Sequence, residues 1–255
     1  MTTPRTIKIV RLLARVIPAF LRNEPFGLHD SLYELDKRVG VYIKFLQIAI
    51  LSSSGIQQSN FNELLKVYED SIPDKINAWQ HLMKFGMPNM NHIARMDPQP
   101  FATGSFGQVY KAQLVTGEQV IIKLLRPSVM KYLRYDLRLL QAFCYAYSFI
   151  DRQKMFNFKQ VYKQFKLSCL QETHYKREAE VASYYHRTYQ NHPQMVIPKT
   201  FLALSNDMVI VQEFISGLSV AKLLQMKNNG LDARQYMQDN FASDLFSQLE
   251  LVGVE

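Results

Sequence analysis

Hydrophobic and polar positions alternate between residues 101 and 125, as they do in a half-buried β-sheet. Val109 to Ala112 form one such run and Val120 to Lys123 another, with the turn residues Thr116-Gly117 between them. Phe101 precedes the first run, across a glycine-containing turn over 102–107. Alternating and β-branched residues bounded by glycine favour a hairpin over a helix. The pattern therefore predicts strand, glycine turn, strand, turn, strand.

Helical periodicity dominates the residues before this hairpin. Apolar residues three and four positions apart predict an amphipathic helix over 6–22. Its apolar face is expected to hold Ile7, Val10, Leu13, Ile17 and Leu21, with basic residues on another face. This helix suits either packing against the rest of the protein or binding to an anionic membrane surface. Further helices are predicted over 28–51, 60–68 and 73–85, and a loop over 86–96.

Long helical patterns follow the hairpin. Helices are predicted over 128–151 and 158–189, strands over 201–204 and 208–214, and helices over 220–227 and 232–251. Asn206-Asp207 suits a turn between the two strands. The run Asp97-Pro-Gln-Pro100 is a stop signal, and it is the best candidate for a domain boundary.

Composition narrows the class of protein. With 255 residues, 47% of them hydrophobic, the chain can bury a substantial core. The net charge of +8 favours an anionic partner, but no recognised motif supports nucleic-acid binding. The two cysteines, Cys144 and Cys169, form neither a metal motif nor a disulfide framework, which indicates a reducing compartment. No apolar run long enough to span a membrane and no signal peptide are found, so we expect a cytoplasmic protein, with peripheral membrane association as an option.

The glycine turn carries the candidate chemistry. Gly104 and Gly107 omit side chains where a backbone lies against something bulky, and backbone amides in such a turn can face phosphate oxygens. Lys123 ends the third strand and can reach the same phosphates as a point charge. A purely structural hairpin is the alternative. The order Ala-x-Gly-x-x-Gly-x-Val, then Ile-x-Lys, resembles the Gly-rich loop and β3 lysine of protein kinases.

Together with the preceding helices, this pattern resembles the UbiB family, also called the AarF or coenzyme-Q atypical kinases. The resemblance runs from about residue 28 to the end. Lys44 and Gln47 match the family's Lys-x-Gly-Gln motif, with Leu46 in place of glycine. The run from Glu172 to Ala179 matches the family's Glu-x-Asp and following Glu-Ala, with His174 in place of aspartate.

The resemblance implies ATP and Mg²⁺ as cofactors. Lys123 would bind the phosphates, and Glu178 would form an ion pair with Lys123. Lys44, with Glu172 as its partner, and Gln47 would close the site from the helical extension. Gln212 resembles the gatekeeper, and backbone groups of Glu213 and Ile215 would hold the adenine. The expected nucleotide contacts are Ala102, Thr103, Gly104, Ser105, Phe106, Gly107, Val109, Lys123, Gln212, Glu213 and Ile215.

The resemblance also implies an α+β fold. A helical N-terminal extension over 1–99 would precede a protein-kinase-like small lobe over 100–218, with a five-stranded antiparallel sheet and inserted helices. Residues 219–255 would start the large lobe. The family's catalytic His, Asp and Asn and its Asp-Phe-Gly motif do not occur before Glu255. We therefore assign no catalytic or metal-binding residue and expect the large lobe to be absent or truncated.

Two functions follow as expectations. The first is an ATP-binding atypical kinase or ATPase that supports ubiquinone (isoprenoid-quinone) biosynthesis or lipid homeostasis. Its partners would be a nucleotide, proteins of the quinone pathway and an anionic membrane surface. The second is a non-catalytic scaffold that binds lipid or partner proteins through the same lobe. Exposed apolar surface in the last helix would favour oligomerisation.

Overall fold

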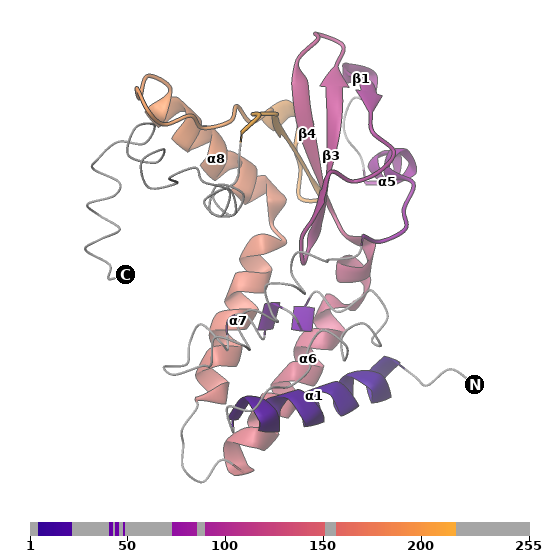
Figure 1. Cartoon of the computed structure of the whole chain (residues 1–255), viewed down its shortest axis with the longest axis vertical. Coiled ribbons are helices and arrows are strands. Elements are labelled where there is room, and N and C mark those ends of the chain that lie inside the picture. Colours follow the sequence, from indigo (N-terminus) through magenta and orange to yellow (C-terminus); the bar gives the residue numbers. More distant parts are fainter. Residues whose placement is uncertain are drawn as a thin grey trace, which may run out of the picture.

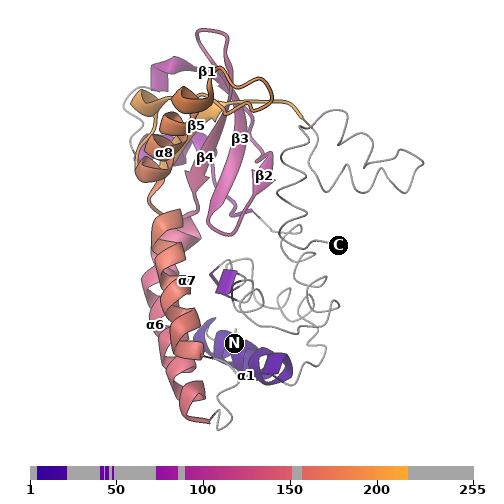
Figure 2. The ribbon, with the colours of Figure 1, turned by 90° about the vertical axis from the view of Figure 1, so that its left-hand side faces the viewer.

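Five strands form one antiparallel sheet in the computed structural model, and long helices extend away from it (Figure 1). The model describes residues 5–21, 41–42, 44–45, 48, 73–85, 90–150 and 157–217. Helices α6 (Pro127–Ile150) and α7 (Phe158–Glu172) run side by side, and α8 (Tyr175–Tyr189) lies next to the sheet (Figure 2). The predicted α+β fold, with a five-stranded sheet and inserted helices, is confirmed.

The sheet is centred on the predicted hairpin. Strands β3 (Gly107–Leu114) and β4 (Gln119–Leu125) pair antiparallel, with Val109 opposite Lys123. The short β2 (Ala102–Thr103) pairs with the start of β3, and β5 (Val209–Glu213) pairs with β4. In the turn between β3 and β4, Gly117 has a φ of 92°, which glycine adopts without steric cost.

One strand lies in a stretch that was predicted as a loop. β1 (Ile93–Met96) follows the 3₁₀ helix η1 (Met90–His92) and pairs antiparallel with β3. A register shift between Ile93 and Arg95 interrupts the alternation, so that only the first and last residues of β1 are buried. The sheet therefore starts before the predicted boundary at residue 99. The division of the chain into domains otherwise remains a prediction.

Residues 201–204 do not form the predicted strand. Backbone pairing of the chain before them with β5 consists of an isolated bridge between Thr200 and Gln212 and two flanking bonds, from the Phe201 amide to the Val211 carbonyl and from the Glu213 amide to the Lys199 carbonyl. The chain then forms the 3₁₀ helix η2 (Leu202–Leu204), because the amide of Leu204 and the hydroxyl of Ser205 both donate to the Phe201 carbonyl. These local bonds replace further strand pairing.

One face of the sheet packs against α5 (Ala78–Lys84). Alternate residues of the central strands, among them Tyr110, Ile122 and Val211, form a buried cluster with Ala78 and Leu82 of that helix. The predicted helix over 73–85 is thus shorter than expected. It begins after Asn77, whose side chain accepts a hydrogen bond from the Gln80 amide and caps the helix. The predicted range would place Asp74 in the first helical turn, but Asp74 lies before the helix in non-helical chain.

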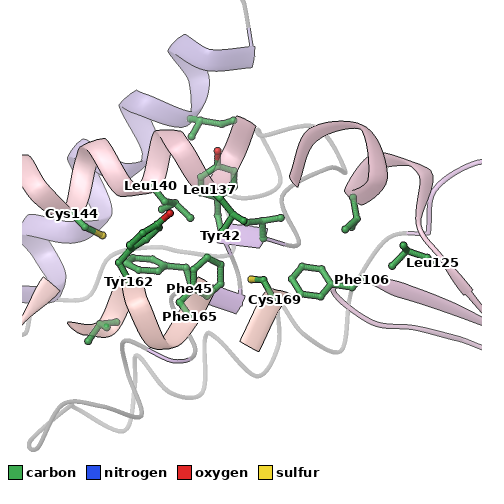
Figure 3. Packing of buried hydrophobic residues seen from close by; sticks show 14 of the residues in the cluster. Tyr42, Phe45, Phe106, Leu125, Leu137, Leu140, Cys144, Tyr162, Phe165 and Cys169 are labelled. Carbon is green, nitrogen blue, oxygen red and sulfur yellow. The ribbon is translucent and has the colours of Figure 1, made fainter. Parts of the chain in front are cut away.

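A second cluster lies between α6 and α7 (Figure 3). Tyr42 and Phe45, from the N-terminal part of the chain, pack there against both helices. The Phe45 and Phe165 rings meet edge to face, with centroids 5.3 Å apart, and the Tyr42 hydroxyl donates to Asp136 over 2.9 Å. Phe106, from the glycine turn, belongs to the same cluster. The turn is therefore anchored on the helices that the N-terminal segment covers.

The N-terminal helix α1 (Arg5–Leu21) joins this second cluster. Ile9 and Leu13 are fully buried in it, so the packing interpretation of this helix is confirmed. The buried face differs from the predicted one, because Ile7 and Val10 are about two-fifths exposed, at 43% and 40%. Within the described part of the chain, no helix is long and apolar enough to cross a membrane.

The predicted helix over 158–189 is two helices. The Thr173 amide and hydroxyl both donate to the Cys169 carbonyl, and the His174 amide donates to Gln171, so α7 ends here. Such side-chain bonds satisfy carbonyls that a continuing helix would use. Because no Gly or Pro marks the break, periodicity did not reveal it. After the break, α8 turns toward the sheet and contacts β5.

Other predictions lie outside the described residues. These are the helices over 60–68, 220–227 and 232–251, most of the helix over 28–51, and the residues Leu46 and Gln47.

Candidate functional site

The second face of the sheet holds the predicted lysine. Side chains alternate between the two faces of a strand, so Val109, Ile121 and Lys123 point away from the cluster on α5. All three are half-buried, whereas their neighbours in sequence are buried. Lys123 thus lies on the face that α8 approaches. It pairs with Val109, which follows closely after the glycine turn.

The structure brings Lys123 and Glu178 together. Lys123 Nζ lies 2.6 Å and 2.9 Å from the two carboxylate oxygens of Glu178. The break between α7 and α8 makes this possible, because it places Glu178 in the first turn of a helix directed at the sheet. Both side chains keep some exposure, at 29% and 41%. The pair fixes a positive charge beside the glycine turn while leaving it open to a ligand.

Hydrogen bonds within the glycine turn leave two amides available. The Gly104 amide donates to the Gly107 carbonyl over 2.8 Å, and the Arg126 amide donates to the Phe106 carbonyl. The amides of Ser105 and Phe106 donate to none of the residues that the structure describes. Successive free amides in a turn form a common binding site for anions.

The two glycines of the turn differ in their surroundings. A Cβ atom on Gly104 would meet only the Gly107 carbonyl at 3.8 Å, an ordinary contact. A Cβ atom on Gly107 would lie 2.5 Å from the Tyr175 hydroxyl and 3.3 Å from Lys123 Cε. The predicted close approach is therefore present at Gly107, where the bulky neighbour is part of the protein itself. It is not present at Gly104.

Tyr175 is a site residue that sequence reasoning missed. Within the predicted helix over 158–189 nothing in the pattern distinguishes it from the other large apolar residues, and its side chain is fully buried. Its ring lies 4.7 Å from Lys123 Nζ, within the range of a cation–π contact. Its hydroxyl has no hydrogen-bond partner among the described residues. Burial, and then the charges of Glu178 and Glu172, raise the pKa of this phenol, so it stays protonated.

A buried ion pair between Asp74 and Arg126 supports the glycine turn. Asp74 accepts hydrogen bonds from Arg126 Nε at 3.0 Å and Nη2 at 2.7 Å, and Arg126 Nη1 donates to the Gly104 carbonyl at 3.1 Å. Asp74 also accepts from the Ser128 amide at the start of α6. Sequence reasoning missed this pair, because its members lie 52 positions apart and neither stands in a motif.

The charge state of Asp74 follows from these contacts. Burial by itself raises the pKa of the Asp74 carboxyl. The hydrogen bonds from Ser128 and the charge of Arg126 outweigh burial and hold that pKa below its ordinary value. The carboxylate is therefore charged at neutral pH, and the ion pair is intact.

The N-terminal segment contributes the second pair that the resemblance implied. Lys44 Nζ lies 2.7 Å from Glu172 at the end of α7. Glu172 also accepts a hydrogen bond from Ser168. His174, which stands where the family has aspartate, begins α8 without a side-chain cap bond. Gln47, the second residue of the extension motif, lies outside the described residues.

The predicted adenine-binding residues lie at the end of β5. Gln212 pairs with Ile121 in the sheet, and its side-chain amide donates to the Thr200 hydroxyl. The Glu213 amide already donates to the Lys199 carbonyl over 2.8 Å, so only its carbonyl remains a candidate for the adenine. Ile215 follows in irregular chain and is 40% exposed. Phe101 and Phe214 meet nearby, with centroids 6.0 Å apart, and Lys111 lies over both rings.

A resident metal has no evident ligand set in this part of the protein. Among the residues that the structure describes, no group of three or more His, Cys, Asp or Glu side chains is close enough to hold a metal ion. The two amides and the Lys123 ammonium group are donors of the kind that phosphate oxygens accept, but the described residues do not themselves build a Mg²⁺ site.

Comparisons with known proteins find similar chains. A "Probable protein kinase UbiB" from Marinobacter nauticus is 27% identical over 237 residues, which is 91% of this chain and 43% of that protein. The "Protein ACTIVITY OF BC1 COMPLEX KINASE 1, chloroplastic" of Arabidopsis thaliana is 26% identical over 213 residues, which is 82% of this chain and 31% of that protein. The chain thus spans less than half the length of either relative.

A solved structure with limited likeness is the complex of Rv3197 with erythromycin from Mycobacterium tuberculosis. It has a TM-score of 0.47 and 20% identity, and the match covers 86% of this chain and 51% of that chain. The family evidence rests instead on sequence. Residues 69–250, well over half of the chain, match the model of the ABC1 atypical kinase-like domain. The chain belongs to the ABC1 atypical kinase-like family.

Proposed function

We propose that this chain binds ATP between the glycine turn and Lys123. The observation that carries the proposal is the Lys123–Glu178 ion pair, which holds an ammonium group beside a turn in which two amides have no partner among the described residues. In protein kinases, a lysine and glutamate paired in this way must both be in place for phosphoryl transfer. The family match makes that comparison appropriate.

Each part of the site has a distinct task in this proposal. The amides of Ser105 and Phe106 donate to phosphate oxygens, and Lys123 supplies a positive charge that Glu178 keeps in place. Val109 and Ile121 provide the half-buried apolar surface on which the adenine lies. The backbone of Glu213 and Ile215 offers the adenine polar contacts. ATP, with Mg²⁺ on its phosphates, supplies the phosphoryl group, which a kinase transfers to its substrate and an ATPase transfers to water.

The role of the whole protein is proposed from its relatives and from the family resemblance. Both relatives described above carry "kinase" in their names, and the chain covers less than half of each. We propose an atypical kinase or ATPase that supports isoprenoid-quinone biosynthesis or lipid homeostasis. The quinone part rests on the resemblance to UbiB, and the Lys44–Glu172 pair supports that resemblance from the extension motif.

Thermal unfolding with and without Mg-ATP tests nucleotide binding. A ligand at about 100 times its dissociation constant adds about 2.7 kcal/mol to the stability of the folded state. We expect ATP to raise the melting temperature of the wild type and to leave the melting temperature of Lys123→Ala unchanged. Lys163→Ala is the matched control, because Lys163 is an exposed lysine on α7, away from the turn. It should respond to ATP like the wild type.

A well-folded wild type that does not respond to ATP would contradict the proposal. The hairpin would then be structural, and a scaffold that binds lipid or partner proteins would become the better interpretation. An equal response of the wild type and Lys123→Ala would place ATP at another site.

The quinone role has its own test. Lys123→Ala introduced into the gene in its host should lower the isoprenoid-quinone content of the cells, measured by extraction and chromatography. A host that lacks the gene altogether and keeps a normal quinone content would refute this role while leaving ATP binding intact.

A further inference from the structure

We propose that the Tyr175 hydroxyl is a phosphate-binding group of this site and donates a hydrogen bond to a phosphate oxygen of the bound nucleotide. The inference rests on the proposed ATP site and adds a residue to it. Tyr175 lies in the first turn of α8, three positions before Glu178, and neither the glycine turn nor the lysine motif points to it.

The first argument is position. The Tyr175 hydroxyl and the Lys123 side chain converge on one point, the place where a Cβ of Gly107 would be, at 2.5 Å and 3.3 Å. The hydroxyl therefore lies beside the last residue of the glycine turn, close to the Lys123 side chain. A phosphate bound by the turn amides and by Lys123 Nζ would lie next to it.

The second argument is the unused hydrogen bond. The hydroxyl is buried and has no partner among the described residues, although buried polar groups are nearly always paired. Glu178 binds Lys123 through both carboxylate oxygens, and Oε1 of Glu172 binds both Lys44 and Ser168. The protein leaves a donor unsatisfied at the point where the proposed ligand carries its negative charge.

The third argument is the type of donor. A phenol that stays protonated can donate to a phosphate oxygen without adding charge to the site. Bonds of this kind to an ionised acceptor are stronger than bonds between neutral groups. The ring also lies 4.7 Å from the ammonium group of Lys123, so that the lysine and the phenol are neighbours in the proposed site.

Tyr175→Phe tests this role because it removes only the hydroxyl. The affinities for Mg-ATP and for adenosine would be measured by calorimetric titration of the whole chain. We expect Tyr175→Phe to weaken Mg-ATP binding about tenfold, the size expected for one hydrogen bond to a charged group. Adenosine affinity should not change, since adenosine has no phosphate. The melting temperature without ligand should stay the same or rise, because an unsatisfied buried donor has been removed.

Tyr184→Phe is the matched control. Tyr184 is on the same helix but 59% exposed, so the same chemical change there should leave both affinities unaltered. Equal Mg-ATP affinity of the wild type and Tyr175→Phe would overturn the inference and leave the proposed function standing. A loss that is equal for Mg-ATP and adenosine would also overturn it, because the hydroxyl would then act through packing. A wild type that binds no Mg-ATP would refute the inference and the ATP site together.

Discussion

Gly107 illustrates what a single position contributes to this site. In a sequence motif, both glycines of the turn are explained by close approach of a ligand. In the structure, Gly104 has room for a methyl group, while the space beside Gly107 is taken by Tyr175 and Lys123. One glycine is therefore required by packing within the protein, before any nucleotide binds.

Alanine substitutions separate these two roles. Gly107→Ala should reduce the free energy of unfolding by about 1–3 kcal/mol, because the new methyl group meets a rigid, buried phenol. Gly104→Ala is the control and should change it by less than about 0.5 kcal/mol. Chemical denaturation of both variants measures the difference. In a Tyr175→Phe background the effect of Gly107→Ala should shrink, because the clashing atom is gone; additive losses would show that the clash is not the cause.

The connections between elements decide how the glycine turn is held. The turn, the start of α6 and the irregular chain before α5 meet at Asp74 and Arg126, which are 11% and 3% exposed. A buried ion pair costs desolvation on both sides, and removal of one partner leaves an uncompensated charge. The turn therefore depends on a segment that precedes it by about thirty positions.

Removal of the Asp74 charge should destabilise the protein in a pH-dependent way. At neutral pH we expect Asp74→Asn to lower the free energy of unfolding by about 3 kcal/mol. The pKa of Asp74 is lower in the folded than in the unfolded protein, so its contribution is fully present above the unfolded value of about 4. It is lost as the pH falls through the folded value. Urea denaturation from pH 7 down to pH 3 should show the wild type and Asp74→Asn converging below about pH 4.

Glu180→Gln serves as the control, since Glu180 is exposed on α8 and has no described ion-pair partner in the structure. It should lie close to the wild type at every pH. A difference between Asp74→Asn and the wild type that is constant down to pH 3 would mean that the loss has another cause than the charge.

At the scale of the whole molecule, the N-terminal helix is part of the same folded unit as the candidate site. Ile9 and Leu13 of α1, Tyr42 and Phe45 of the next described segment, and Phe106 of the glycine turn share one cluster (Figure 3). The ion pair between Lys44 and Glu172 adds a polar connection to α7. Substitutions that disrupt the packing of α1 should therefore lower the stability of the core that supports the turn.

Truncation of one buried side chain tests this connection. Ile9→Ala should lower the free energy of unfolding by about 2–5 kcal/mol, because Ile9 is fully buried. Val10→Ala is the neighbouring control and should cost less than about 1 kcal/mol, since Val10 is 40% exposed. Guanidinium denaturation followed by circular dichroism measures both. Equal small losses would indicate that α1 does not fold together with the cluster around α6 and α7.

Local patterns in the sequence were sufficient for much of this architecture. The β3–β4 hairpin, the long helix α6, strand β5 and the position of Lys123 all follow from turn residues and periodicity, which act between near neighbours. The family resemblance added Glu178 and Lys44 as candidates, and the structure places each beside its expected partner.

Tertiary contacts decided the rest. The edge strand β1 forms because β3 offers it a partner, and the α7–α8 break depends on side-chain bonds that no glycine or proline marks. The buried face of α1 follows from its packing in the cluster shared with α6 and α7, where Ile9 and Leu13 are buried. Asp74 meets Arg126, and Tyr175 lies under Gly107, across separations at which sequence periodicity carries no information. The residues that support the candidate site could therefore be identified only from the tertiary structure.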